Sequence, residues 1–257
     1  MGVRGQVGGR SAPSVINLSY AQNGVFWDGR AKSLEDQAKG PIANPIEMAN
    51  THEAVAAKLN TIPGYRDQFQ QVFGSPDVTI DNVAKAIAAF ERTIISGNAP
   101  WDRFMKGETT ALSDSAKPGW ELFQNKANCI KCHAGFNLTD NAYHNLGVGF
   151  DKPNPDLGRY EVTKAGEDRG RFKTPTLREI TYTGPYMHDG SHQTLEEVIE
   201  FYNKGGVKNP QLDVEMKPLN LTAAEKADMV AFLKSLNGEG WMAKAPIALP
   251  ADRRPGS

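Results

Sequence analysis

One hexapeptide constrains this chain more than any other stretch: Asn128-Cys129-Ile130-Lys131-Cys132-His133. Two cysteines separated by two residues, with a histidine directly after the second, are spaced to bond both vinyl groups of one haem while the imidazole ligates its iron. These are also the only two cysteines among the 257 residues. The motif therefore predicts a c-type cytochrome whose haem is held by Cys129, Cys132 and His133.

Other uses of paired cysteines fit the sequence less well. A structural zinc site needs four ligands, usually from a second Cys/His pair at similar spacing, which the sequence lacks. A thioredoxin-like dithiol needs a strand before the motif, whereas residues 113–126 have a helical pattern. A redox dithiol and a buried pair without chemistry remain the alternatives to haem attachment.

Length and charge exclude several classes of protein. A chain of 257 residues can hold two domains with cores, and its net charge of −1 offers no basic field for nucleic acid. No apolar run is long enough to span a membrane, and residues 1–10 lack the apolar region of a secretory signal. Because haem is normally attached outside the bacterial cytoplasm, we expect a periplasmic protein that was processed or shortened at its start.

Hydrophobic spacing and capping residues predict a mainly α fold without comparable strand signals. The expected helices cover residues 33–40, 51–60, 63–73, 79–95, 113–126, 194–204 and 222–236. The fourth has the clearest apolar face, formed by Ile80, Val83, Ile87, Phe90 and Ile94. Residues 1–25 and 151–180 are expected to be mostly irregular, and the tail after Trp241 loosely ordered.

A polar segment at residues 106–110 is the expected boundary between two halves. We expect an incomplete N-terminal domain at 1–108 and a C-terminal cytochrome c-like haem domain at 109–257. An early haem-binding helix and a late amphipathic helix, opened by the capping box Thr222-x-x-Glu225, are typical of a small cytochrome c.

Five motifs in a fixed order make the chain resemble the bacterial di-haem cytochrome c peroxidases and their MauG relatives. They are Phe26-Trp27-Asp28-Gly29-Arg30-Ala31, residues 37–48, Cys-Ile-Lys-Cys-His at 129–133, Thr174-Pro175-Thr176-Leu177-Arg178 and Tyr186-Met187-His188-Asp189-Gly190. The similarity runs from about residue 10 to residue 237. The family carries two haem motifs, and the first, which precedes the Trp-Asp-Gly-Arg segment, is missing from this sequence.

The resemblance assigns roles around the family's peroxide-binding haem to four residues. Glu47 matches the acid/base that moves a proton between the two peroxide oxygens, so that water leaves. Gln37 matches its hydrogen-bonding companion, and Pro41 the residue that shapes the pocket. Trp27 matches the aromatic relay between the haems. Taken singly, each has an ordinary reading as a loop acid, a surface amide or a core aromatic, but their matching spacing favours the functional one.

The distal ligand of the second haem separates the branches of this family. Peroxidases that accept electrons from small cytochromes place a methionine fourteen residues after the histidine of the Tyr-x-His-Asp-Gly motif, whereas MauG relatives place a tyrosine there. Counting from His188 reaches Tyr202. A phenolate lowers the reduction potential of haem iron and a thioether raises it. The sequence thus indicates the MauG branch, with Met216 or Met187 as the alternative ligand and a core role as the alternative for Tyr202.

Further family features are less complete. Thr183 and Pro185 match positions whose backbone carbonyls bind Ca²⁺, but Ser11 stands where the family has an asparagine ligand. His188 and His192 are equally compatible with binding a haem propionate and with a surface position. MauG relays electrons to its protein substrate through a tryptophan just before the haem motif, and Ala127 and Asn128 occupy that place.

Two functions of different class remain. The first is a peroxide-using oxidoreductase in which Glu47 assists O–O cleavage at the first haem and Trp27 relays electrons between the two haems. A redox protein is then the electron donor or the oxidised substrate. The second is a mono-haem electron-transfer protein without peroxidase activity. Because no haem motif precedes Trp27 here, we expect the chain alone to lack full peroxidase activity.

Overall fold

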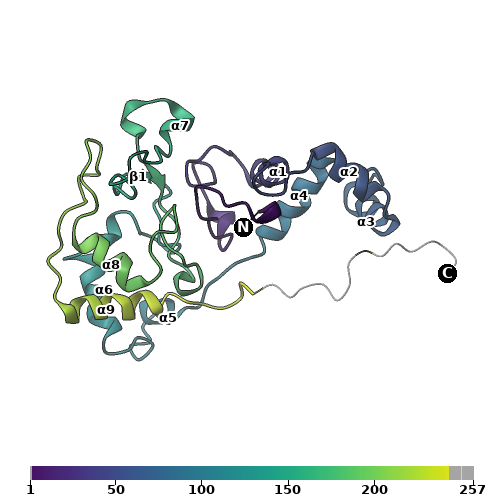
Figure 1. Ribbon diagram of the computed structural model, residues 1–257. Coiled ribbons are helices and arrows are strands. Elements are labelled where there is room, and N and C mark those ends of the chain that lie inside the picture. The colour runs from purple at the N-terminus through teal and green to yellow at the C-terminus, as the bar shows by residue number, and fades with distance from the viewer. Residues whose placement is uncertain (1, 243–249, 251–257) are drawn as a thin grey trace. The chain divides into compact units, whose positions relative to one another are not determined.

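The computed structural model describes residues 2–242 and residue 250. Within them the chain is mainly helical, as predicted, with two short strands (Figure 1). The described residues form two compact units: residues 2–8 and 31–93 belong to the first, and residues 9–30 and 94–241 to the second. The expected domain boundary near residue 108 stays a prediction. Apart from residues 242 and 250, the tail predicted to be loose lies outside the described residues.

The first unit is built from helices that begin where capping residues predict. Its elements are a 3-10 turn Val3–Gly5 and the helices α1 Leu34–Ala43, α2 His52–Asn60, α3 Pro63–Phe73 and α4 Ile80–Glu91. The hydroxyls of Ser33, Thr51 and Thr79 each accept a hydrogen bond from a backbone N–H in the first turn of α1, α2 and α4. The predicted ranges of α2 and α3 are confirmed.

Two predicted helix ends in this unit are wrong. Helix α1 does not stop at Gly40 but continues through Pro41 to Ala43. A proline near the end of a helix removes only one hydrogen bond, here the one to the Gln37 carbonyl, and the next turn is closed by Asn44 N donating to Gly40 O over 3.0 Å. Helix α4 ends at Glu91 rather than Ile95, and Phe90, expected on its apolar face, is 54% exposed.

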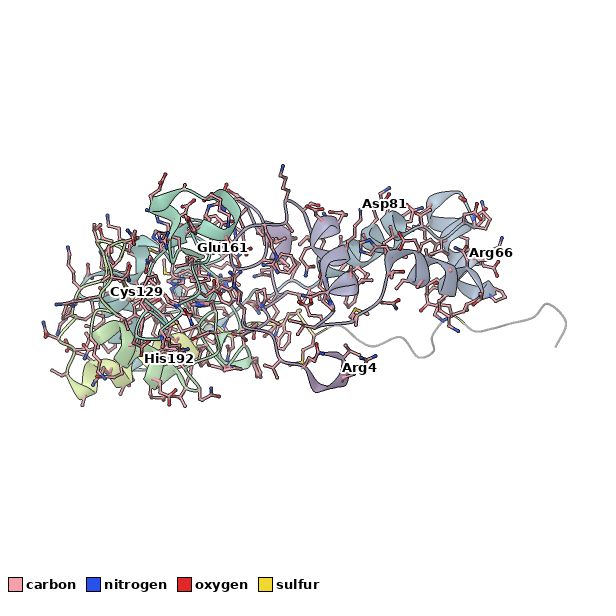
Figure 2. The ribbon with its side chains drawn as sticks, turned by 45° about the horizontal axis from the view of Figure 1, so that its top comes forward. Arg4, Arg66, Asp81, Cys129, Glu161 and His192 are labelled. Carbon is pink, nitrogen blue, oxygen red and sulfur yellow. The ribbon has the colours of Figure 1, made fainter. Side chains whose placement is uncertain are left out.

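The first unit has a small-residue contact and a separate apolar cluster. Helix α1 packs on α4, where Ala84 and Ala88 are fully buried. Phe69 of α3 is buried with Val78 and Val83 in the second cluster. Most charged side chains of these helices lie at the surface, as Arg66 and Asp81 do in Figure 2, whereas Glu91 at the end of α4 is buried.

The second unit contains the haem motif. Its helices are α5 Pro100–Met105, α6 Ala116–Gln124, α7 Tyr160–Thr163, α8 Leu195–Asn203 and α9 Ala223–Lys234. Its 3-10 turns are Leu18–Tyr20, Cys129–Lys131, Gly166–Asp168 and Ile180–Tyr182. Its strands are β1 Tyr143–His144 and β2 Phe172–Lys173. The strands pair antiparallel. The capping box predicted at Thr222 is present, and Thr194 forms a second one. Helices α5 and α7 were not predicted.

The core of this unit lies between α6 and α9. Gly119 is required at their contact, because a Cβ there would lie 2.0 Å from the carbonyl oxygen of Asp228. Trp120, Phe123 and Phe232 pack with ring centroids 4.9 to 5.9 Å apart. Helix α8 also packs on α9. This arrangement holds the end of α6, from which the haem motif follows. No helix among the described residues is long and apolar enough to cross a bilayer.

Candidate functional site

The Cys-x-x-Cys-His segment forms a tight turn after α6. The turn is entered at Asn128, whose φ of 51° is left-handed, and it is closed by His133 N donating to Cys129 O over 2.9 Å. This turn places both cysteine side chains and the imidazole on the wall of one cavity. Both thiols are free, and burial raises the pKa of Cys129 to about 12. The thiols are thus positioned to form two covalent bonds to one flat ligand.

The cavity measures about 200 Å³ and is mostly apolar. Its apolar wall is supplied by α6, α8, α9 and the segments between them, including Phe123, Leu146, Val148, Ile199, Met229 and Leu233. A tetrapyrrole is a large apolar plate, so a pocket of this chemistry with two thiols and an imidazole on its wall fits a covalent haem.

His133 is held in the tautomer that metal ligation needs. Its Nδ1 lies 2.9 Å from the Leu138 carbonyl oxygen. Since a carbonyl can only accept, Nδ1 carries the proton and the Nε2 lone pair is free. Burial lowers the pKa of the imidazole, so it is neutral at pH 7. A neutral imidazole with a fixed Nδ1–H is the state that binds iron.

Tyr202 of α8 lies on the same cavity wall. Burial raises the pKa of its phenol, and the part of the chain that the structure describes offers its hydroxyl no hydrogen bond. A hydroxyl without a partner beside a cofactor pocket is available as a ligand. Met216 and Met187 line the cavity as well, so the geometry keeps all three candidate distal ligands near the site.

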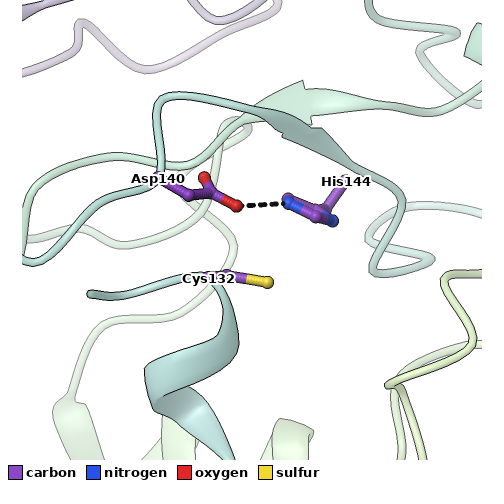
Figure 3. Close-up of side chains that lie close together, drawn as sticks. All are labelled: Cys132, Asp140 and His144. Atoms are coloured by element: carbon purple, nitrogen blue, oxygen red, sulfur yellow. Dashed lines mark hydrogen bonds and ion pairs between the residues drawn. The ribbon is translucent and has the colours of Figure 1, made fainter.

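A second polar group adjoins the haem motif. Ligand atoms of Cys132, Asp140 and His144 lie within 4.8 Å of one another (Figure 3). His144 bridges two carboxylates, with Nε2 2.8 Å from Asp140 and Nδ1 2.6 Å from Asp213. Cys132 and then both carboxylates raise the pKa of His144 to about 10. A thioether at Cys132 removes the first of these causes and leaves the carboxylates to hold the imidazolium.

Trp27 also lies on the cavity wall. Its indole Nε1 donates to the Ser11 carbonyl over 2.8 Å, and its own carbonyl accepts from Lys173 N over 2.7 Å. Ser11 and Pro185 both lie near Gly190, within 3.7 Å of the position that a Cβ would take there. The backbone carbonyls of Thr183 and Pro185 accept no hydrogen bond from any residue that the structure describes.

His188 and His192 differ in their surroundings. His188 is 4% exposed, lines the cavity and stacks on Phe172 with ring centroids 3.6 Å apart. Burial lowers its pKa to about 4. His192 is partly exposed, and its Nδ1 lies 2.9 Å from Ser191 Oγ. Of the two, His188 is the one that faces the cofactor pocket.

The remaining predicted site residues belong to the first unit. Gln37 and Pro41 are one turn apart on α1, and both are partly buried. Glu47 follows in the turn after α1, where its Oε1 accepts a hydrogen bond from Asn44 Nδ2 over 2.9 Å. This unit thus brings Gln37, Pro41 and Glu47 into one short stretch, whereas Trp27 belongs to the second unit.

Comparison with known proteins agrees with this geometry. A family model described as di-haem cytochrome c peroxidase matches residues 1–110, and one described as cytochrome c matches residues 116–237. The methylamine utilization protein MauG of Methylorubrum extorquens is 42% identical over 244 residues, which is 94% of this chain and 67% of that protein. The chain belongs to the di-haem cytochrome c peroxidase family.

Other members of the di-haem peroxidase family are similarly close. The cytochrome c551 peroxidase of Nitrosomonas europaea is 40% identical over 256 residues, covering 98% of this chain and 72% of the relative. A crystal structure of a MauG-like protein associated with microbial copper homeostasis superposes with a TM-score of 0.85 at 31% identity, over 95% of this chain and 79% of that one. The predicted helical fold and the predicted c-type haem oxidoreductase of the peroxidase/MauG type are thus confirmed.

Three polar residues of the cavity wall, His144, Asp213 and Lys173, are not among the site residues that the sequence predicts. Lys173 also lines the cavity, and burial lowers its pKa to about 8. The only signal for His144 was its position, twelve residues after Cys132 and four after Asp140. Asp213 gives no such signal, because the fold alone brings it to His144.

Proposed function

We propose that Cys129 and Cys132 would hold one haem c through thioethers, and that His133 and Tyr202 would ligate its iron. The observation that carries the proposal is the single apolar cavity wall that holds both thiols, the neutral imidazole and the unpartnered phenol. When bound, the haem supplies one-electron redox chemistry. The protein's contribution is to bind and orient it and to keep water away.

The two proposed iron ligands, His133 and Tyr202, have different roles. His133 presents Nε2 because the Leu138 carbonyl holds the proton on Nδ1. Tyr202 would hold the iron as a phenolate, since a bound metal would reverse the effect of burial on the phenol's pKa. An anionic oxygen then favours the oxidised state of the site. Met216 in that place favours the reduced state.

We further propose that Glu47, Gln37 and Pro41 serve hydrogen peroxide, which is the substrate class of the family. Reduction of peroxide to two water molecules consumes two electrons and two protons. Glu47 takes a proton from one peroxide oxygen and returns it to the other, so that the leaving oxygen departs as water. Because Oε1 is engaged by Asn44, Oε2 is the atom that carries this proton. Gln37 would orient peroxide, Pro41 would shape its pocket, and Trp27 would relay electrons between the haems in the family's two-haem arrangement.

The redox partner and the cellular location are proposed from the same family. A redox protein supplies electrons to this chain or is itself oxidised by it. This chain works in the periplasm, where haem is attached to such motifs. Thr183 and Pro185 would bind Ca²⁺ through carbonyl oxygens, which a hard cation prefers. Neither carbonyl accepts a hydrogen bond from the described residues, which supports this.

Haem stoichiometry tests the proposal most directly. Matured with a haem-attachment system, the chain should carry one covalent haem by mass and by its pyridine haemochrome spectrum, and Cys129→Ala/Cys132→Ala should carry none. Anaerobic titration with peroxide then separates the two functions. Peroxide consumption coupled to a reduced cytochrome supports the oxidoreductase, whereas reversible reduction without it supports the mono-haem carrier. The single haem motif of this sequence is the observation that favours the second outcome for this chain alone.

A further inference from the structure

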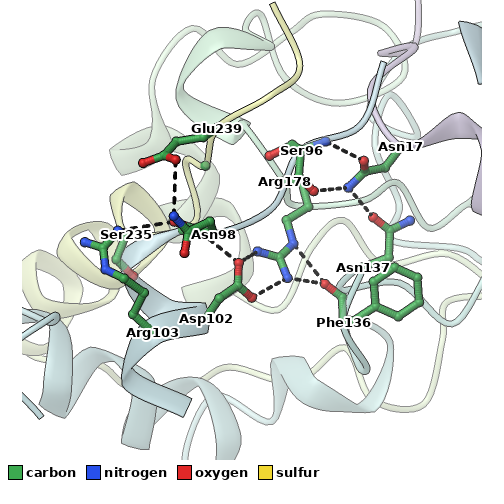
Figure 4. A network of polar contacts seen from close by, with 12 residues as sticks. Asn17, Ser96, Asn98, Asp102, Arg103, Phe136, Asn137, Arg178, Ser235 and Glu239 are labelled. Atoms are coloured by element: carbon green, nitrogen blue, oxygen red, sulfur yellow. Dashed lines mark hydrogen bonds and ion pairs between the residues drawn. The ribbon is translucent and has the colours of Figure 1, made fainter. Parts of the chain in front are cut away.

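Arg178 is a buried cation that joins two separate segments of the second unit. Its side chain is 3% exposed. The two terminal nitrogens donate to both oxygens of Asp102 on α5, each over 2.7 Å. Its Nε donates to the Phe136 carbonyl over 2.9 Å, and Nη2 donates to that carbonyl as well (Figure 4). The guanidinium therefore fastens residue 136 to α5.

The residues around Phe136 form the loop that follows the haem-ligating histidine. Thr176 Oγ1 donates to the carbonyl of Asn137 over 2.6 Å, and Asn17 Nδ2 donates to its Oδ1 over 3.1 Å. The loop is thus held at two successive residues from outside, by Arg178 at Phe136 and by Thr176 with Asn17 at Asn137. Leu138, whose carbonyl holds His133 Nδ1, comes next.

Leu138 adopts a backbone conformation that leucine does not choose by itself. Its φ of 50° is left-handed, and its side chain is 1% exposed. A left-handed non-glycine residue persists only where the surrounding structure determines it. The hydrogen bonds to Phe136 and Asn137 contribute to that determination, together with Leu138 N donating to Gly135 O over 3.1 Å and Thr139 Oγ1 donating to Thr174 O over 2.7 Å. Without them the loop can relax, and the Leu138 carbonyl turns away from the imidazole.

We propose that Arg178, held in place by Asp102, is a positioning residue for the axial ligand His133. It acts through the 134–139 loop, by keeping the Leu138 carbonyl on the Nδ1–H of His133. This hydrogen bond gives the imidazole partial anionic character and makes it a stronger donor to oxidised iron. The inference rests on the assignment of His133 as axial ligand in the proposed function. Loss of the Arg178 contact should therefore move the haem midpoint potential to a more positive value.

The test variant has to remove the tether without leaving an unpaired buried charge. Arg178→Met/Asp102→Asn does so, because the introduced amide keeps an oxygen that can accept the hydrogen bond from Ala99 N that Asp102 now accepts over 2.8 Å. Thr176→Val is a milder variant that removes the hydroxyl, which donates to the Asn137 carbonyl and accepts from Arg178 N over 3.1 Å, and Thr176→Ser restores it. Arg171→Gln serves as the matched control, since Arg171 is a half-exposed arginine of the same unit that pairs with Asp168.

Two readouts on the haem-loaded protein decide the question: the midpoint potential by spectroelectrochemistry and amide hydrogen exchange by mass spectrometry. We expect the double variant and Thr176→Val to shift the potential upward and to speed exchange in residues 134–139 about tenfold, while Thr176→Ser and Arg171→Gln change neither. An unchanged potential, or exchange that rises equally throughout the second unit, overturns the inference. If the double variant does not fold, the Thr176 pair alone decides. Failure of the proposed function is distinct, because the wild-type chain then attaches no haem at His133.

Discussion

Replacing Tyr202 by Phe should change the state of the haem iron while barely changing the cavity. The two side chains differ by one hydroxyl, and that hydroxyl has no hydrogen-bond partner among the residues that the structure describes. The variant therefore loses a ligand and a negative charge but little packing. We expect an open sixth coordination site and a more positive midpoint potential, so that ascorbate reduces the variant but not the wild type.

The size of the effect follows from the acidity of the phenol. An ordinary tyrosine has a pKa of 10.0, and burial raises that of Tyr202 further. Because each tenfold change in acidity corresponds to about 1.4 kcal/mol, a phenolate at pH 7 requires the iron to contribute at least about 4 kcal/mol. Acid competes with this bond by protonating the phenolate. Ligation by Tyr202 should therefore weaken as the pH falls. The midpoint potential should become more positive over the same fall in pH.

Absorption spectra and redox titration of the ferric protein provide the assay. Tyr186→Phe is the control, because Tyr186 lines the same cavity but its hydroxyl donates to the Ile180 carbonyl over 3.0 Å. That variant should lose about 1 kcal/mol of stability and keep the wild-type spectrum. The reasoning is refuted if wild type shows the sulfur-to-iron charge-transfer band of a methionine ligand and loses it in Met216→Ala but not in Tyr202→Phe.

Three further predictions concern other parts of the chain. In a protein that carries both haems of the family, Glu47→Gln should slow peroxide activation by about two orders of magnitude without changing haem content. The control Glu53→Gln, at an exposed residue, should leave the rate unchanged. Equal stopped-flow rates for wild type and Glu47→Gln would show that Glu47 has no part in the reaction. Because burial lowers the pKa of His188 to about 4, the unfolded chain binds an extra proton between about pH 6.5 and 4, and up to about 3 kcal/mol of stability should be lost as the pH falls through that window. Urea unfolding of His188→Gln should lack this part of the pH dependence, and an identical slope would refute the assignment. Ca²⁺ added after chelation should raise Tm, more so in Ser11→Asn, if the Thr183 and Pro185 carbonyls bind it; a Tm independent of Ca²⁺ in both proteins would exclude the site.

Local sequence was sufficient for the features that depend on neighbouring residues. The haem motif, the helix starts at Thr51, Thr79, Thr194 and Thr222 and the full range of α3 all follow from residues within one or two turns. A helix cap or a Cys-x-x-Cys-His turn is made by groups only a few positions apart, so it can be predicted from the sequence alone. The family and its haem chemistry could be predicted for the same reason, since its motifs are short and ordered along the chain.

The tertiary structure decided whatever depends on partners far along the chain. Helix α4 ends at Glu91, and the Ile94 carbonyl, predicted to lie in the helix, accepts a hydrogen bond from Asn17 N, a partner that no local sequence pattern predicts. His144 belongs to the site because the fold places Asp213 within hydrogen-bond distance of it. Arg178 contacts the 134–139 loop while it is paired with Asp102 of α5. Bringing such residues together has a large entropic cost that only the packed core offsets. The sequence therefore contains these residues but does not show that they are in contact.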